Sequence, residues 1–301
     1  MRTVYLGTSE FAAAVLRALA DSPHRPRLVI TRPDRPRGRG RRLASPPVAR
    51  AARDLGLELT QPASVNEDQA RHGIAAARPE VLCVCAFGAL IREPLLTDHE
   101  ILNVHPSLLP RWRGAAPVER AIMAGDAHTG VSIMRLVAAL DAGPTCLTRA
   151  EPIAPDDTYG TLAGRLQGLG GELLVQALDA MAAGELRFAA QDESAVTYAE
   201  KITPEDRLLN GSGSAAALGR LVRALAPHIG AAVALPGGER LGVLEAVARE
   251  PADGDPAPGE LSLTGRVPVL GASPGALALT VVQPAGRRPM AGDAYLRGWR
   301  G

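Results

Sequence analysis

Strand-like and helix-like segments alternate along the first half of the chain, and this alternation limits the fold more than any other feature of the sequence. The strand-like segments are short apolar runs at residues 3–6, 27–30, 81–86, 101–105, 131–137 and 146–153. The helix-like segments cover residues 10–20, 48–55, 67–77, 118–124 and, with interrupting glycines, 158–183. A chain that alternates in this way folds into a mostly parallel sheet covered by helices. The sequence therefore predicts an α/β domain.

The chain changes character near residue 206, where it becomes rich in Gly, Ser and Pro. Beyond this point, a helix-like run precedes several short apolar runs, and these segments lie at residues 215–225, 231–235, 241–248, 265–270 and 277–282. Short strands separated by turns are typical of a small β-barrel. The length of 301 residues also favours two domains, since one domain commonly holds about 100–200 residues. We expect one domain at residues 1–205 and a second at residues 206–301.

The charge of the chain is nearly balanced, with a formal net charge of +1, which argues against wholesale electrostatic binding of nucleic acid. The basic residues are unevenly placed, however. Six arginines are opposed by Asp34 alone in one short stretch: Arg32, Arg35, Arg37, Arg39, Arg41 and Arg42. Gly38 and Gly40 give this stretch a flexible backbone, and guanidinium groups pair well with phosphates or guanine edges. An RNA contact and a solvated basic flap are both consistent with this pattern.

Several classes of protein do not fit the sequence. The longest apolar run, residues 81–91, is too short to span a bilayer, and the N-terminus lacks a secretory signal, so we expect no membrane contact and a cytoplasmic location. The cysteines Cys83, Cys85 and Cys146 have no further ligands at metal-binding spacing, so we expect free thiols and no metal. No P-loop or dinucleotide-binding fingerprint follows the first strand, and nucleotide cofactors are not implied.

Asn103 and His105 are the first candidates for chemistry. They alternate in a strand-like segment, so their side chains share one face. Pro106 ends the strand and places the pair at its carboxyl end, where open α/β sheets bind their ligands. An Asn and a His that merely bond to each other at a strand end would show the same spacing. The pair alone therefore leaves both interpretations open.

The residues after this pair extend it into a long and unusual string. Residues 103–110 read NVHPSLLP, residues 111–117 read RWRGAAP, and residues 140–143 read LDAG. These segments closely resemble the signature of the methionyl-tRNA formyltransferase family. Other similar segments lie at residues 6–12, 33–40, 125–131 and 197–202, and after residue 206 the resemblance thins to residues 221–225 and 283–290. Pro144 departs from the family pattern, which commonly has an acidic residue at this position.

The resemblance implies a Rossmann-like formyltransferase domain that binds 10-formyltetrahydrofolate and an OB-like barrel that helps to hold initiator methionyl-tRNA. The chemistry of the residues agrees. Attack of an amine on a formyl carbon creates a negative oxygen, for which Asn103 supplies a hydrogen-bond donor. His105 can exchange the proton of the amine, as a base or as a charged partner of the oxyanion. Asp141 can orient the imidazole or a bridging water.

The resemblance also implies which residues contact the two substrates. Seven residues are predicted to surround the folate: Phe87, Gly88, Leu90, Ser107, Leu108, Leu109 and Pro110. The arginine-rich loop is predicted to contact the acceptor end of the tRNA, with Arg39 as its most important residue. Lys201, the only lysine in the chain, is predicted to face the tRNA from the linker. On residue chemistry alone, residues 107–110 could be an ordinary turn and Lys201 a neutral surface residue.

Other functions share the same three catalytic candidates. Relatives with this constellation formylate a purine-pathway amine or a sugar nucleotide, or hydrolyse formyl-folate with water, and the fold cannot separate them. Residues 111–117, the C-terminal extension and the arginine-rich loop together favour the tRNA enzyme. A catalytically silent RNA-binding protein is the alternative of another class, against which the intact Asn103, His105 and Asp141 argue. We expect the protein to be a monomer.

Overall fold

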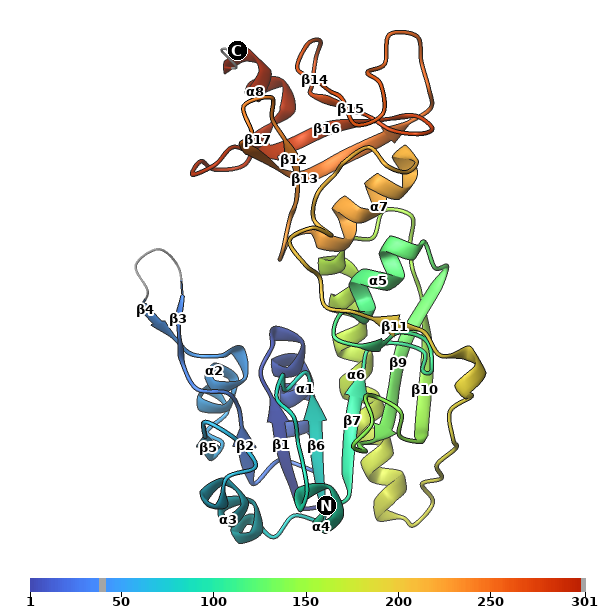
Figure 1. Cartoon of the computed structure of the whole chain (residues 1–301). Helices are drawn as coiled ribbons and strands as arrows, with labels where there is room; N and C mark the ends of the chain where they lie inside the picture. The colour runs from blue at the N-terminus through green and yellow to red at the C-terminus, as the bar shows by residue number, and fades with distance from the viewer. Residues whose placement is uncertain (38–41, 299–301) are drawn as a thin grey trace. The chain divides into compact units, whose positions relative to one another are not determined.

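The computed structural model describes residues 1–37 and 42–298, and its N-terminal part is built around a seven-stranded sheet (Figure 1). The strand order is β10-β9-β7-β6-β1-β2-β5. The strand bounds are β1 Thr3–Gly7, β2 Leu28–Ile30, β5 Leu59–Thr60, β6 Val81–Cys85, β7 Ile101–His105, β9 His128–Arg135 and β10 Thr145–Pro152. Neighbouring strands from β5 to β7 are parallel, and β9 runs antiparallel to β7. The predicted α/β class with a mostly parallel sheet is confirmed.

The central strands are buried on both faces because helices cover the sheet. All residues of β1, β6 and β7 are buried, as parallel strands between two helical layers require. The helices of this part are α1 Glu10–Ala20, α2 Pro47–Asp54, α3 Asp68–Ala77, α4 Leu95–Asp98, α5 Pro117–Ala124 and α6 Tyr159–Ala182. Helix α1 begins where the Ser9 side chain accepts a hydrogen bond from the Ala12 amide at 3.2 Å.

The arginine-rich stretch differs from the loop that the sequence predicts. Two short strands, β3 (Arg35–Arg37) and β4 (Arg42–Ala44), pair antiparallel with Arg35 opposite Ala44. The prediction excluded an interior strand because proline and glycine are frequent here. The two strands pair only with each other, apart from the main sheet, and an isolated edge of this kind tolerates Pro36. Residues 38–41, between the strands, lie outside the described part of the chain.

The C-terminal part contains a six-stranded sheet in the order β12-β13-β16-β15-β14, with β17 also paired to β16. The elements are α7 Ala215–Leu225, β12 Ala231–Ala234, β13 Arg240–Arg249, β14 Leu261–Ser262, β15 Val269–Gly271, β16 Ala276–Gln283, β17 Met290–Ala291 and α8 Gly292–Gly298. The pairings are antiparallel, and the register of β13 shifts around Glu245. Such a bulge bends a strand and increases its twist, which helps the sheet to curl. The curled antiparallel sheet confirms the predicted OB-like fold.

The described chain divides into two compact units whose segments are not contiguous in sequence. The first comprises residues 1–114, 129–152 and 163–198, and the second comprises residues 115–128, 153–162 and 199–301. A short pair of strands, β8 (Arg113–Gly114) and β11 (Tyr198–Ala199), completes the described strands. The single boundary near residue 206 remains a prediction about which segments fold independently. In the described residues, no helix is both long and apolar enough to cross a membrane.

Candidate active site

Asn103 and His105 lie at the carboxyl end of β7, as predicted. Both side chains are almost buried, with 8% of Asn103 and 4% of His105 exposed. The two residues are two positions apart along the strand and therefore share one face of the sheet. The side-chain amide of Asn103 makes no hydrogen bond to any described residue of the chain. Its amide atoms are not among the fully buried polar atoms that lack a partner, so they reach solvent and leave a donor available to a ligand.

His105 is held between a backbone carbonyl and a carboxylate. Its Nε2 lies 2.9 Å from the Trp112 carbonyl oxygen, and its Nδ1 lies 3.6 Å from Oδ2 of Asp141. A carbonyl oxygen only accepts hydrogen bonds, so Nε2 carries the proton and donates. In the neutral ring, Nδ1 then has a lone pair that faces the carboxylate. A proton on Nδ1 would turn this contact into a favourable ion pair.

Asp141 lies on the loop between β9 and β10 and has a left-handed backbone, with φ of +46°. This conformation costs an ordinary L residue about 1–2 kcal/mol, and Asp tolerates it better than most. Its Oδ2 accepts a hydrogen bond from the Gly114 amide at 2.9 Å. Only 12% of the side chain is exposed. The structure therefore brings Asp141 to His105 from a segment 36 positions later in the sequence (141 minus 105).

The predicted folate segment after β7 is a tight loop that is bonded to itself. The Ser107 hydroxyl donates to the Arg111 carbonyl at 2.6 Å, and the Ser132 hydroxyl donates to the Ser107 carbonyl at 2.8 Å. Ser107 is fully buried, whereas Leu108, Leu109 and Pro110 are half-buried. Ser107 thus shapes the loop, and the three residues after it have surface left for a ligand.

The second predicted folate segment follows β6. Phe87 is buried in the apolar core of the sheet, and its carbonyl accepts from the Thr8 hydroxyl at 2.7 Å. Gly88 has φ of +71°, which favours glycine, and its carbonyl accepts from the Arg32 guanidinium. Leu90 is 68% exposed, an unusual state for leucine that leaves an apolar surface available. No described contact tests whether these residues bind folate, and their role stays a prediction.

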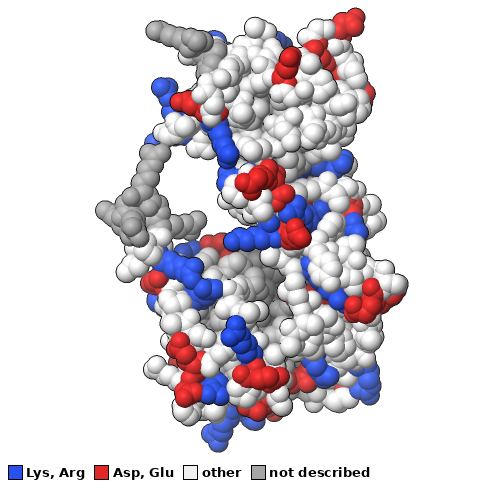
Figure 2. All heavy atoms as spheres, viewed as in Figure 1, with Lys and Arg blue, Asp and Glu red and all other residues white. Residues whose placement is uncertain are grey.

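The predicted tRNA-binding residues are spread over two segments. Arg35 is exposed on β3, and the backbones of Arg37 and Arg42 end β3 and begin β4. Arg39 and Arg41 lie outside the described residues. Lys201 is exposed and has no hydrogen bond or ion pair within the part of the chain that the structure describes. Figure 2 shows basic and acidic side chains interspersed on the viewed face, in line with the balanced charge.

A network behind the Asp141 loop was not predicted from the sequence. Arg113 is only 3% exposed, and it bonds to Gln191 and Glu193. Gln191 in turn donates to two carbonyls of the Asp141 loop. Arg113 lies in the quoted signature, which could have marked it as buried. Gln191 lies in a polar segment without periodicity, and nothing in its sequence context indicates a role.

The cysteines are buried or half-buried free thiols, as predicted. Burial raises the pKa of Cys83 and Cys85 to about 12 and that of Cys146 to about 11. Such thiols are almost fully protonated at neutral pH and are poor nucleophiles. Within the described residues, no group of His, Cys, Asp and Glu side chains could hold a metal ion.

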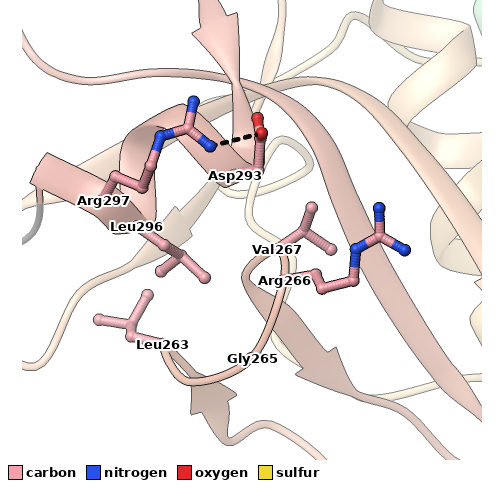
Figure 3. A pocket seen from close by; sticks show the side chains of 7 residues that line it. All are labelled: Leu263, Gly265, Arg266, Val267, Asp293, Leu296 and Arg297. Atoms are coloured by element: carbon pink, nitrogen blue, oxygen red, sulfur yellow. Dashed lines mark hydrogen bonds and ion pairs between the residues drawn. The ribbon is translucent and has the colours of Figure 1, made fainter.

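A hollow lies in the second, C-terminal unit, between α8 and the loop after β14 (Figure 3). Its volume is about 850 Å³, and its lining residues are Leu263, Gly265, Arg266, Val267, Asp293, Leu296 and Arg297. The Arg297 guanidinium donates to the Asp293 carboxylate at 2.7 Å, so this pair is already satisfied. The hollow contains none of the catalytic candidates.

Comparison with known proteins identifies the family of the chain. The family model "Formyl transferase" matches residues 1–178, and "Formyl transferase, C-terminal domain" matches residues 201–300. The methionyl-tRNA formyltransferase of Methylococcus capsulatus is 43% identical over 298 residues, which cover 98% of this chain and 96% of that protein. The chain belongs to the methionyl-tRNA formyltransferase family. The relative from Pseudomonas paraeruginosa is 41% identical, over 98% of this chain and 95% of its own. The family membership predicted from the signature is confirmed.

Solved structures of other formyltransferase-fold proteins share the architecture. HypX from Aquifex aeolicus, in complex with tetrahydrofolic acid, aligns with a TM-score of 0.66 at 18% identity and covers 99% of this chain. This chain spans about half of HypX, at 47% of its length. WlaRD, a sugar 3N-formyl transferase, aligns with a TM-score of 0.68 at 12% identity, over 96% of this chain and 99% of its own. At these identities, the likeness concerns the fold alone.

Proposed function

We propose that the chain transfers the formyl group of 10-formyltetrahydrofolate to the amino group of initiator methionyl-tRNA. The observation that carries the proposal is the unpartnered amide of Asn103 beside the paired His105 and Asp141, in a chain that matches tRNA formyltransferases over nearly its full length. The product would be N-formylmethionyl-tRNA for translation initiation. We expect the reaction to take place in the cytoplasm, because charged tRNA is used there.

The Asn103 amide would stabilise the transition state. The amine attacks the formyl carbon, and the carbonyl oxygen becomes negative as the new C–N bond forms. An Nδ2–H of Asn103 can donate to that oxygen without first breaking a bond to the protein. Because the side chain is nearly buried, it needs little reorganisation, which is the condition for effective electrostatic stabilisation. Breaking of the bond between the formyl carbon and N10 of the folate then completes the transfer.

His105 and Asp141 would manage the proton. The attacking amine loses one proton, and N10 of the folate gains one as it leaves. With Nε2–H committed to the Trp112 carbonyl, the free lone pair of neutral His105 is on Nδ1. A proton accepted there would be stabilised by the Asp141 carboxylate at 3.6 Å. The geometry supports His105 as a proton acceptor more readily than as a permanent oxyanion partner.

The substrates would be held by the segments around this centre. The half-buried Leu108, Leu109 and Pro110 and the exposed Leu90 offer apolar surface to the ring system of a folate. Ser107 shapes the first of these loops through its hydroxyl and its carbonyl, and Phe87 and Gly88 shape the second through their carbonyls. For the tRNA, we propose contacts from Lys201 and from five arginines of the β3–β4 region: Arg35, Arg37, Arg39, Arg41 and Arg42. All three catalytic candidates come from one chain, so a monomer suffices.

The proposal is tested by comparing acceptors in one assay. The purified chain is given 10-formyltetrahydrofolate and initiator methionyl-tRNA, free methionine or a dTDP-linked amino sugar. We expect rapid transfer to methionyl-tRNA and little to the other two amines. Transfer to the sugar nucleotide at a comparable or higher rate, or release of formate without transfer, would assign the site to another member of the fold.

A further inference from the structure

We infer that Gln191 is a positioning residue for the formyl transfer, acting as a clamp on the loop that carries Asp141; the inference rests on the proposed function. Its Nε2 donates to the Asp141 carbonyl at 2.8 Å and to the Gly143 carbonyl at 2.7 Å. These carbonyls flank Ala142, so a single amide group fixes both sides of the turn. Gln191 lies about 50 positions further along the chain, and its side chain connects that later segment to the Asp141 loop.

Arg113 fixes the orientation of the clamp. Its Nε and Nη2 donate to Oε1 of Gln191 at 3.0 and 2.9 Å, and its Nη2 also donates to Glu193 at 2.7 Å. Donors therefore face one end of the Gln191 amide, and carbonyl oxygens face the other. An amide has two acceptor sites and two donor hydrogens, and all four are used here. The amide can neither flip nor be replaced by a group that only accepts.

The Asp141 loop needs such a restraint because its backbone is unusual. Asp141 has φ of +46°, a region that L residues rarely adopt. Gly143 lies so close to the main sheet that an added Cβ would be 1.8 Å from the Arg135 carbonyl oxygen. The residues before Asp141, including Leu140 at 60% exposure, are open to solvent and provide little packing. Hydrogen bonds from Gln191 thus compensate for packing that the loop lacks.

The clamp acts on catalysis through the position of one carboxylate. Arg113, which orients Gln191, is followed directly by Gly114, whose amide donates to Oδ2 of Asp141 at 2.9 Å. The short strand β8 therefore holds both parts of Asp141. It holds the backbone through Arg113 and Gln191, and it holds the side chain through the Gly114 amide. Without Gln191, the carboxylate would lose its fixed distance from Nδ1 of His105, and the proton acceptor would lose its support.

The first test is Gln191→Glu, a nearly isosteric change. The new carboxylate can still pair with Arg113 but cannot donate to the two carbonyls. We expect kcat to fall by about 10- to 100-fold, as for a misplaced catalytic group, while KM for both substrates and the melting temperature stay close to wild type. The matched control is Gln176→Glu on α6, where the Gln176 side chain accepts from Arg149 at 3.1 Å on the surface. An unchanged kcat in Gln191→Glu would overturn the inference.

A double-variant cycle separates the clamp from a general structural role. If Gln191 acts through Asp141, then Gln191→Glu should add almost no loss of kcat to an Asp141→Asn variant. Full multiplication of the two losses would show that Gln191 acts elsewhere and would overturn the inference.

Hydrogen exchange tests the clamp without relying on activity. We expect the Gly114 amide, which bonds to Asp141, to exchange at least about tenfold faster in Gln191→Glu and at the wild-type rate in Gln176→Glu. Equal exchange in all three proteins would refute the clamp even if formyl transfer is intact. Conversely, a wild-type chain that exchanges as expected but fails to formylate methionyl-tRNA would refute the proposed function and leave the clamp standing.

Discussion

The side chains at the end of β7 differ mainly in how many of their hydrogen-bonding groups already have a partner in the protein. Asn103 keeps its donors free, while His105 has one nitrogen committed to a carbonyl and the other directed at Asp141. Spacing along the strand predicts the first two residues as a pair, and the family signature adds Asp141. The contact between His105 and Asp141 could not be predicted from spacing, because it depends on a left-handed turn held by Gln191.

Asp141→Asn tests the electrostatic part of this arrangement. Asn tolerates a positive φ and can still accept from Gly114, so the loop and the melting temperature should be preserved. Without the negative charge, a proton on Nδ1 of His105 is no longer stabilised, and kcat should fall by about 10²- to 10⁴-fold. Steady-state kinetics with Asp253→Asn, an exposed residue of the C-terminal unit, as control would check this. A kcat within error of wild type would mean that the charge of Asp141 is not used.

The secondary-structure elements were predictable where capping and a continuous pattern agree. The sequence predicts α1 and α7 with their observed bounds, and the two helices begin behind Ser9 and Ser214, whose side chains accept from backbone amides. Besides the β3–β4 pair, the strands and α-helices that were missed are short: β5, β8, β11, β14, β17, α4 and α8. Strands of two residues are defined by their pairing partners, which a local pattern does not contain. The β3–β4 hairpin was missed because its prolines and glycines are more common in irregular loops.

Variants of the arginine-rich hairpin should distinguish general electrostatic attraction to tRNA from specific recognition of initiator tRNA. Arg39 lies outside the described residues, and its predicted role rests on the family resemblance. We expect Arg39→Ala to raise KM or lower kcat for initiator tRNA and to reduce the preference over elongator methionyl-tRNA. Arg42→Ala should weaken the binding of both tRNAs alike. It should also reduce the slope of log affinity against log salt concentration by about one unit. Arg17→Ala, on the exposed face of α1, is the control.

The hairpin would be only an electrostatic patch under one outcome. The outcome is that Arg39→Ala and Arg42→Ala weaken the binding of initiator and elongator tRNA equally and change the salt dependence of binding by the same amount.

At the scale of the whole molecule, chain order and compact units do not coincide. The second unit recruits α5 and the start of α6 from the middle of the sequence. Glu119 of α5 accepts from His228 at 2.9 Å, and the ring of Tyr159 stacks on His228 at 3.7 Å. Met123 packs against the apolar core of the C-terminal unit. The change in composition near residue 206 marks a change in local structure, but it carries no information about these long-range contacts.

A chain that ends at Arg207 should therefore be less stable than the full chain. It keeps α5 but lacks α7 and the core against which Met123 packs, so apolar surface is exposed. We expect a lower melting temperature and a greater tendency to aggregate, measured by thermal unfolding and light scattering. A truncated chain that melts cooperatively at the temperature of the full protein would show that residues 1–205 fold as an independent domain.

The most direct test of the catalytic account is the single-turnover rate of formyl transfer in Asn103→Ala. The enzyme is mixed in excess with initiator methionyl-tRNA and saturating 10-formyltetrahydrofolate, so that neither binding nor product release limits the rate. Asn210→Ala, an exposed residue of the C-terminal unit, provides the control. If the free amide of Asn103 stabilises the oxyanion, the rate should fall by about 10²- to 10³-fold in Asn103→Ala, with folding intact and the control unchanged. A rate for folded Asn103→Ala close to that of wild type would contradict the proposed role of this site.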